Sequence, residues 1–189
     1  MSRMVNTSAE RGEKFRAFAA SLCSGGDPRA ARLMDEMRRV SHHLYQLGEA
    51  SLASAGLSYA QYRILMVLLF HEWLGDEQGL NPSTISAEQG TSRNTISALI
   101  RSLEEAGLIE RHLDAEDRRR FNIRLTEAGR IQVSEHANRH ICTIADIFAA
   151  LTPEEMATLS TLLQKLYDRA QVVKEEITTN PGGSYATSR

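Results

Sequence analysis

The 189-residue sequence predicts a mainly α-helical fold that contains one small β-hairpin. Apolar residues recur at helical spacing through most of the chain, which is typical of amphipathic helices. Serine, threonine or asparagine stands at the start of most of these segments, where such residues cap helices. One short segment around residue 123 instead alternates apolar and polar residues, as a half-buried strand does.

The composition is that of a folded protein and excludes disorder of the whole chain, because 42% of the residues are hydrophobic and 24% are charged. The longest apolar run, residues 64–70, is far shorter than the roughly 20 residues of a membrane span. The first ten residues lack the apolar stretch of a secretion signal, so we expect a cytoplasmic protein without a membrane partner. The net charge of −2 does not exclude a nucleic-acid partner, since the position of the basic residues decides that.

The N-terminal part of the chain divides into an arm and a long helix. Residues 1–27 form the arm, in which a short amphipathic helix fits over residues 9–22, ahead of a glycine-rich linker. A helix is predicted over residues 28–55, because its apolar positions are spaced by four and three residues in turn, as in a seam between two helices. These positions are Leu33, Met37, Val40, Leu44 and Leu47.

Capping signals delimit the elements that follow. The helices are predicted to begin after Ser58 with its partner Gln61, after Asn81 with Pro82, after Ser92, after Thr126, and after Thr152 with Pro153. Strands are predicted over residues 108–112 and 121–125, on either side of a charged turn. The last helix carries an apolar stripe up to Ile177, and residues 178–189 are expected to be a disordered tail.

Two helices joined by a tight turn at Gly90 and followed by a hairpin form a winged helix-turn-helix. The exposed positions at the start of the second helix are small or forked hydrogen-bonding side chains, which suit base edges and phosphates. They are Ser92, Arg93, Asn94, Thr95 and Ser97, with Arg101 placed further along to hold the backbone. The alternative is a solvated helix whose serine and threonine residues only cap it.

The turn of the hairpin is strongly basic. Arg118, Arg119 and Arg120 follow one another where the fold alone would favour glycine or asparagine. Arginines at the tip of a wing can enter the minor groove of A·T-rich DNA. The alternative is that the three arginines only spread into solvent or are neutralised by Asp114, Glu116 and Asp117.

Several stretches of the sequence resemble the MarR family of bacterial regulators, and the resemblance covers about residues 28–177. They are residues 57–62, 90–96, 103–111, 114–119 and 125–129. The resemblance implies a homodimer that binds a palindromic operator in double-stranded DNA, most simply as a repressor. The DNA-binding lobe would span residues 58–125, and the dimerisation helices residues 28–55 and 126–177.

The same resemblance implies roles for the wing and for a ligand. Asp117 and Arg119 match the family's Asp-x-Arg, in which the arginine enters the minor groove and the aspartate orients it. Many relatives respond to a small aromatic or phenolic ligand. The candidate pocket residues are Tyr45, Tyr62, Arg63 and Trp73, for which packing in a helical core is the alternative.

His136 and His140 are spaced by four residues and could hold zinc from one helix face, so a zinc-responsive regulator is a second hypothesis. Zinc-sensing relatives have a further ligand where this chain has Arg63, and a solvated histidine pair is the alternative. We otherwise expect no cofactor.

Three other functional classes find less support in the sequence. The chain has no catalytic motif such as GxSxG, a Walker loop or HExxH, so we expect no enzyme. Peroxide sensing is not expected either. Peroxide-sensing members of the family that the chain resembles carry their reactive cysteine inside the first long helix, and neither Cys23 nor Cys142 lies there. A winged-helix module that binds protein in place of DNA is a further alternative, against which the arginines of the wing argue.

Overall fold

The computed structural model describes residues 27–76, 78–113 and 120–180, together with five single positions between residues 12 and 21. The chain forms two compact units. One spans Tyr45–Ile147, and the other combines Met1–Leu44 with Phe148–Arg189. The helix that follows the hairpin therefore belongs to the same unit as the predicted DNA-binding lobe, whereas the sequence grouped it with the dimerisation helices.

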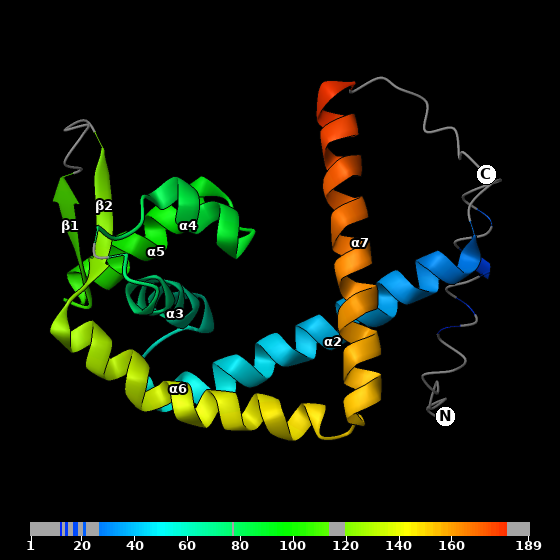
Figure 1. Ribbon diagram of the computed structural model, residues 1–189, viewed down its shortest axis with the longest axis horizontal. Coiled ribbons are helices and arrows are strands. Elements are labelled where there is room, and N and C mark those ends of the chain that lie inside the picture. Colours follow the sequence, from blue (N-terminus) through cyan, green and yellow to red (C-terminus); the bar gives the residue numbers. More distant parts are fainter. Residues whose placement is uncertain are drawn as a thin grey trace, which may run out of the picture. The chain divides into compact units, whose positions relative to one another are not determined.

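The helices and strands predicted from residue 28 onward are present, with ends that differ by a few residues (Figure 1). In chain order they are α2 (Pro28–Leu52), η1 (Ala53–Ala55), α3 (Tyr59–Trp73), α4 (Pro82–Gln89), α5 (Arg93–Glu105), β1 (Ile109–Leu113), β2 (Phe121–Leu125), α6 (Glu127–Phe148) and α7 (Pro153–Thr179). Helix α7 continues two residues into the segment predicted as a disordered tail; the tail beyond residue 180 and most of the N-terminal arm lie outside the described residues.

The core of the Tyr45–Ile147 unit is apolar and gathers around α3, α5 and the hairpin. Helices α2 and α6 each contribute to it, through Leu52 and Val133. The largest side chains that are fully buried are Tyr62, Leu52, Ile64, Leu65, Ile85, Ile96, Ile100, Leu103, Ile123, Leu125 and Val133. Burial of each such aliphatic side chain contributes roughly 1.5–3 kcal/mol to folding, so this cluster holds the lobe together.

The capping predictions are confirmed. At α3, the backbone N–H of Gln61 donates to Ser58 Oγ (3.2 Å) and the backbone N–H of Ser58 donates to Gln61 Oε1 (2.8 Å). The side chains of Asn81, Ser92 and Thr152 accept hydrogen bonds from the first turns of α4, α5 and α7. Each bond satisfies an amide that the helix itself leaves free.

The hairpin has a neighbour that the sequence did not reveal. Strands β1 and β2 pair antiparallel, and Leu80 adds an isolated bridge to the other edge of β2, with N–O distances of 3.1 and 2.8 Å to Ile123. Because β2 is flanked on both edges, it is more covered than an edge strand. Asn122, expected on the solvent face of the strand, is only 9% exposed.

The Leu-Thr-x-x-Gly segment fixes the end of the hairpin to the end of α5. The Thr126 hydroxyl donates to the carbonyl of Gly107 (2.7 Å) and accepts from the backbone N–H of Gly129 (3.1 Å), while the backbone N–H of Thr126 donates to the carbonyl of Leu108 (3.1 Å). A side chain at Gly129 would collide with that same carbonyl, so α6 approaches closely only because this residue is glycine.

An ion pair connects α6 to α3 within the same unit. Arg130 donates to both carboxylate oxygens of Glu72 at 2.8 and 3.1 Å, and also to the carbonyl of Leu125 at 3.2 Å. The hydrogen bonds to Glu72 raise the pKa of Arg130 above its ordinary value. A two-pronged contact of this kind fixes direction as well as distance, and so orients α6 on the lobe.

Helix α7, in the other unit, leaves its apolar stripe exposed. Leu162, Leu163, Leu166 and Ile177 are between 44% and 54% exposed. Among the described helices, no single one is long and apolar enough to cross a membrane. Helix α2 with η1 reaches that length and hydrophobicity only when α3 is added, and the chain bends by 86° between the two.

Candidate nucleic-acid interface

The first turns of α5 present a continuous polar surface. Ser92 caps the helix, and its Oγ also lies 2.9 Å from Thr95 Oγ1. Ile96, Ile100 and Leu103 are buried on the opposite face and hold the helix on the core. The DNA contacts predicted for this helix and its cap are all exposed: Ser92, Arg93, Asn94, Thr95, Ser97 and Arg101.

A tight turn sets the angle between α4 and α5. Gly90 has a φ of 61°, in the left-handed region that favours glycine. The Ser86 hydroxyl donates to the carbonyl of Thr91 (2.6 Å), and the backbone N–H of Thr91 donates to the carbonyl of Ser86 (3.2 Å). These two bonds close the turn from both sides and place the start of α5 beside the end of α4.

Helix α4 is in turn fastened to α3. Gln89 Nε2 donates to the carbonyl of Arg63 (3.1 Å), and Arg63 Nη2 donates to the carbonyl of Gln89 (3.4 Å). His71 Nε2 lies 2.9 Å from Glu88 Oε1. Arg63 was predicted as a ligand-pocket residue, and its contact with the helix-turn-helix was not foreseen because the partner lies 26 residues away in the sequence.

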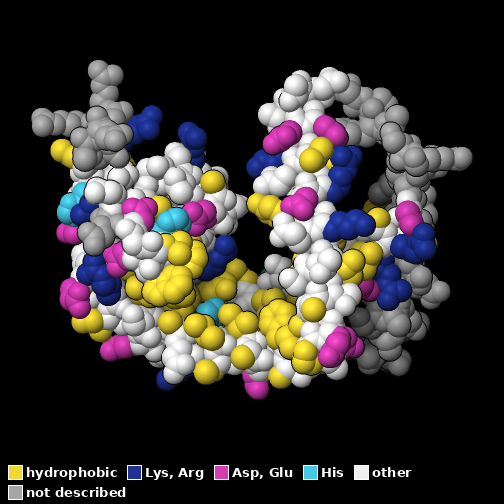
Figure 2. Space-filling model, in the orientation of Figure 1, with side chains coloured by type: hydrophobic (Ala, Val, Ile, Leu, Met, Phe, Trp, Pro, Cys, Tyr) yellow, Lys and Arg dark blue, Asp and Glu magenta, His cyan; other side chains and the backbone are white. Residues whose placement is uncertain are grey.

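Only part of the wing lies within the described residues. Asp117, Arg118 and Arg119 lie outside them, whereas Arg120 is exposed at the start of β2. Arg111 of β1 stacks on the Phe121 ring at 4.8 Å and pairs with Glu104 of α5 at 2.9 Å. These contacts fasten the base of the wing to α5. Figure 2 shows basic side chains at the edge of the lobe from which the hairpin projects.

The predicted ligand-pocket residues fall into two groups. Tyr62 is 1% exposed, and its ring packs on Tyr59, which Tyr45 meets edge-on at 5.2 Å. Trp73, in contrast, is 78% exposed and stacks on Phe70 at the end of α3. The structure thus gathers Tyr45 and Tyr62 in one aromatic cluster and leaves Trp73 outside it.

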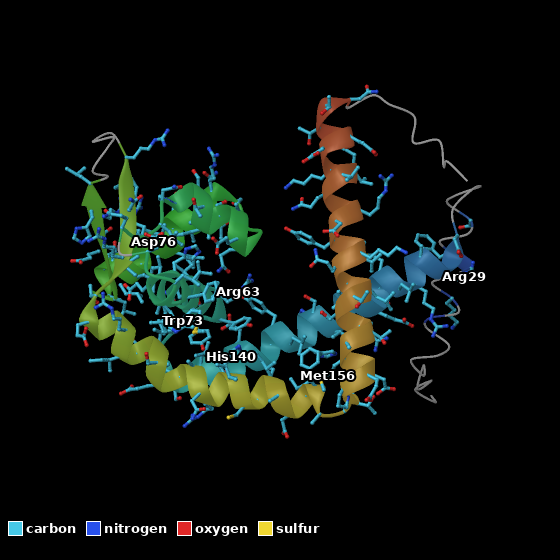
Figure 3. The ribbon with its side chains drawn as sticks, viewed as in Figure 1. Arg29, Arg63, Trp73, Asp76, His140 and Met156 are labelled. Atoms are coloured by element: carbon cyan, nitrogen blue, oxygen red, sulfur yellow. The ribbon has the colours of Figure 1, made fainter. Side chains whose placement is uncertain are left out.

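His140 joins this aromatic cluster from α6 (Figure 3). Its ring lies 5.2 Å from that of Tyr62 and 5.3 Å from that of Tyr59. Burial lowers the pKa of His140 and raises the pKa of Tyr62 to about 12. Within the described part of the chain, Tyr62 Oη and His140 Nδ1 are buried without a hydrogen-bond partner.

Among the described residues, the structure adds no further metal ligand to the predicted zinc site. His136 and His140 are both half-buried on α6. Among the described residues, no three His, Cys, Asp or Glu side chains form a group that could hold a metal ion. The histidine pair therefore stays a prediction from the sequence.

Comparisons with known proteins point to the same kind of regulator. The MarR family model matches residues 55–120, which include α3, α4, α5 and β1. The HTH-type transcriptional repressor YetL of Bacillus subtilis is 25% identical over 143 residues, which cover 76% of this chain and 81% of YetL. The structure of S. aureus MepR in complex with DNA superimposes with a TM-score of 0.66 at 27% identity, over 72% of this chain and 96% of MepR. These matches are all to the MarR family of transcriptional regulators or to proteins similar to it.

These similarities confirm the predicted winged helix-turn-helix fold and the class of DNA-binding transcriptional regulator. A second MarR-family structure, CouR of Rhodococcus jostii RHA1, is bound to p-coumaroyl-CoA. It superimposes with a TM-score of 0.57 at 25% identity, over 72% of this chain and 87% of CouR. MarR-family proteins are transcriptional regulators, a class distinct from the enzymes.

Proposed function

We propose that this protein represses transcription as a homodimer on a palindromic operator, with α5 in the major groove and the wing in the adjacent minor groove. The observation that carries this proposal is the exposed polar row on α5, held in place by the buried Ile96, Ile100 and Leu103. Arginine and asparagine at such positions form paired hydrogen bonds with base edges. MepR, a similar protein whose structure was solved in complex with DNA, supports DNA as the partner.

Fluorescence anisotropy with DNA from upstream of the protein's own gene tests this function. The wild-type protein should bind saturably, weaken steeply as salt rises, and retain its preference over an excess of random DNA. Asn94→Ala should weaken operator binding by about 1–3 kcal/mol. Asn138→Ala, an exposed change of the same kind on α6, is the matched control and should bind as wild type.

Equal affinity for operator and random DNA would contradict sequence-specific recognition. Absence of all DNA binding by a folded dimer would favour a module that binds protein, provided that zinc does not restore binding. Restoration by zinc would instead support a metal site at His136 and His140.

We further propose that a small aromatic or phenolic ligand at the Tyr45–Tyr62–His140 cluster releases the protein from DNA. The buried Tyr62 Oη and His140 Nδ1 are the polar groups there that a ligand hydroxyl or carboxylate could satisfy. A screen of aromatic acids, oxidants and zinc for release of labelled operator is the test. Operator affinity that stays unchanged across the whole screen would contradict ligand control.

A further inference from the structure

A histidine between two carboxylates joins the end of α3 to the helix-turn-helix. His71 Nε2 lies 2.9 Å from Glu88 Oε1 in the last turn of α4, and His71 Nδ1 lies 3.9 Å from Asp76 Oδ2 in the loop after α3. The other carboxylate oxygen of Asp76 accepts from the backbone N–H of Gln78 at 3.0 Å. Both ring nitrogens of His71 therefore face a carboxylate oxygen, and the two carboxylates belong to different segments of the chain.

The other charged groups around His71 have partners of their own. Glu72, the next residue of α3, binds Arg130 of α6 at 2.8 Å. Arg124 of β2 lines the same small cavity as His71, and its guanidinium donates to the carbonyl and to Oε1 of Gln78 at 3.1 and 3.2 Å. Among the described residues, the carboxylates at ion-pair distance from the His71 ring are thus those of the loop and of α4.

The two protonation states of His71 differ in what they can bind. A neutral imidazole carries one N–H and presents a lone pair at its other nitrogen. In either tautomer, one nitrogen of His71 therefore faces a carboxylate that it cannot bind. An imidazolium has an N–H at both nitrogens, so it attracts Glu88 and Asp76 at once, and hydrogen bonds between charged groups are the stronger kind.

The contact with Glu88 bears on the position of α5. The last turn of α4 is fastened to α3 by the bonds between Gln89 and Arg63, and again by the contact between Glu88 and His71. An amide and a guanidinium do not change charge near neutral pH, so only the second of these two contacts responds to a proton. Glu88 stands two residues before Gly90, the turn from which α5 begins. A change in the hold on Glu88 therefore acts on the helix that carries the predicted base contacts.

We propose that His71 is a proton-sensitive clamp on the helix-turn-helix. In its protonated form it holds α4 and the loop after α3 in the arrangement that binds the operator, and loss of the proton loosens this hold. Operator affinity therefore rises as the pH falls from about 8 to about 6, a range in which histidine side chains change charge. By linkage, binding of the operator draws a proton onto the protein. The inference rests on the proposed function and adds the proton as its regulator.

Operator affinity at two pH values tests the clamp. Fluorescence anisotropy at about pH 6 and about pH 8, at constant ionic strength, gives the ratio of the two affinities for each protein. This ratio should be at least about threefold larger for wild type than for His71→Gln, which is the size of effect that a partly exposed ion pair supports. His42→Gln, the same change at an exposed position of α2, is the control and should keep the wild-type ratio.

Two further variants keep the test decisive if His71→Gln does not fold, which thermal unfolding at both pH values would show. Glu88→Gln and Asp76→Asn each remove one carboxylate, so each should lower the affinity ratio. The removal of a negative charge from the DNA-binding lobe also changes affinity by itself, but it does so alike at both pH values and leaves the ratio unchanged.

Proton uptake gives a second readout. Calorimetric titration of the operator in two buffers that differ in ionisation enthalpy counts the protons taken up on binding at about pH 7. Wild type should take up more protons than His71→Gln, Glu88→Gln or Asp76→Asn. Equal uptake by wild type and the folded variants would contradict the clamp.

The outcomes separate this inference from the proposed function. If wild type does not prefer operator to random DNA at either pH, the proposed function fails and the inference fails with it. If wild type binds specifically but has the same affinity ratio as the folded variants, the inference alone is overturned. An equal loss of affinity at both pH values in His71→Gln would give the histidine a structural role only, and would overturn the inference as well.

Discussion

At the scale of single residues, Thr126 shows how one side chain joins three elements. Its hydroxyl both donates to Gly107 and accepts from Gly129, so it caps α6 while holding the α5–β1 turn. The sequence predicted the cap, because threonine at that position precedes an apolar helical pattern. It did not predict the bond to Gly107, which spans 19 residues and depends on how the hairpin folds back.

Replacing Thr126 with valine should remove both hydrogen bonds and keep the side chain's size. We expect a loss of about 1–2 kcal/mol in the free energy of unfolding, measured by urea denaturation. Thr178→Val, an exposed change near the end of α7, is the control and should alter stability little. Equal stability of both variants would show that the two hydrogen bonds of the Thr126 hydroxyl contribute nothing to the free energy of unfolding.

His140 gives stability a dependence on pH. Because burial lowers its pKa below the ordinary value of 6.5, the unfolded chain binds a proton at a higher pH than the folded chain does. Stability from this residue is therefore present above pH 6.5 and is lost as the pH falls through the lowered pKa. His140→Phe keeps an aromatic ring without the titration.

The free energy of unfolding should consequently fall less between about pH 7.5 and about pH 5 in His140→Phe than in wild type. Urea denaturation at both pH values measures the difference. An identical decrease in the two proteins would show that His140 does not titrate differently on folding.

Arg101 and Arg119 should differ in what they do to DNA binding. Arg101 is exposed partway along α5, where it can reach phosphate; its loss should weaken all sequences alike and lower the salt slope by about one unit. Arg119→Ala should cost about 1–3 kcal/mol of operator affinity if this arginine enters the minor groove. Unchanged affinity of Arg119→Ala would contradict the assignment of the wing.

At the scale of elements, the helices were predictable because their ends carry local signals. Asn81 with Pro82, Ser92 and Gly90 each act within a few residues of their own position, so the sequence alone places them. The bridge from Leu80 to Ile123 and the burial of Asn122 were not predictable in this way. The bridge forms because a segment far earlier in the chain reaches the free edge of β2.

The turn between α4 and α5 offers a test at this scale. A Cβ at Gly90 would meet no atom within 4 Å, so any cost of substitution comes from the φ of 61° alone. Gly90→Ala should destabilise the protein by about 1–2 kcal/mol. Gly90→Asn should cost less, since asparagine tolerates this conformation. Equal losses in thermal denaturation would mean that the left-handed turn is not the cause.

At the scale of the whole molecule, α7 presents a surface that one chain leaves open. Leu162 and Leu166 are more than half exposed on a helix that has no buried residue in its own chain. A two-fold homodimer, as the MarR family implies, would bury such a stripe against its copy. The sequence indicated the stripe, but periodicity alone does not identify the surface that covers it.

Leu162→Glu should therefore dissociate the dimer and with it the affinity for a palindromic site. Thr161→Glu introduces the same charge on the opposite side of α7 and is the control. Sedimentation velocity gives the mass of each variant, and anisotropy gives its DNA affinity. A Leu162→Glu protein that remains dimeric would place the interface elsewhere.

DNase I footprinting on the DNA upstream of the protein's own gene is the most direct test of specific recognition by a symmetric dimer. We expect protection of one short region that contains an inverted repeat, with half-sites about one helical turn apart or a multiple of it. Protection that is absent, or that spreads evenly along the fragment as protein is added, would contradict it.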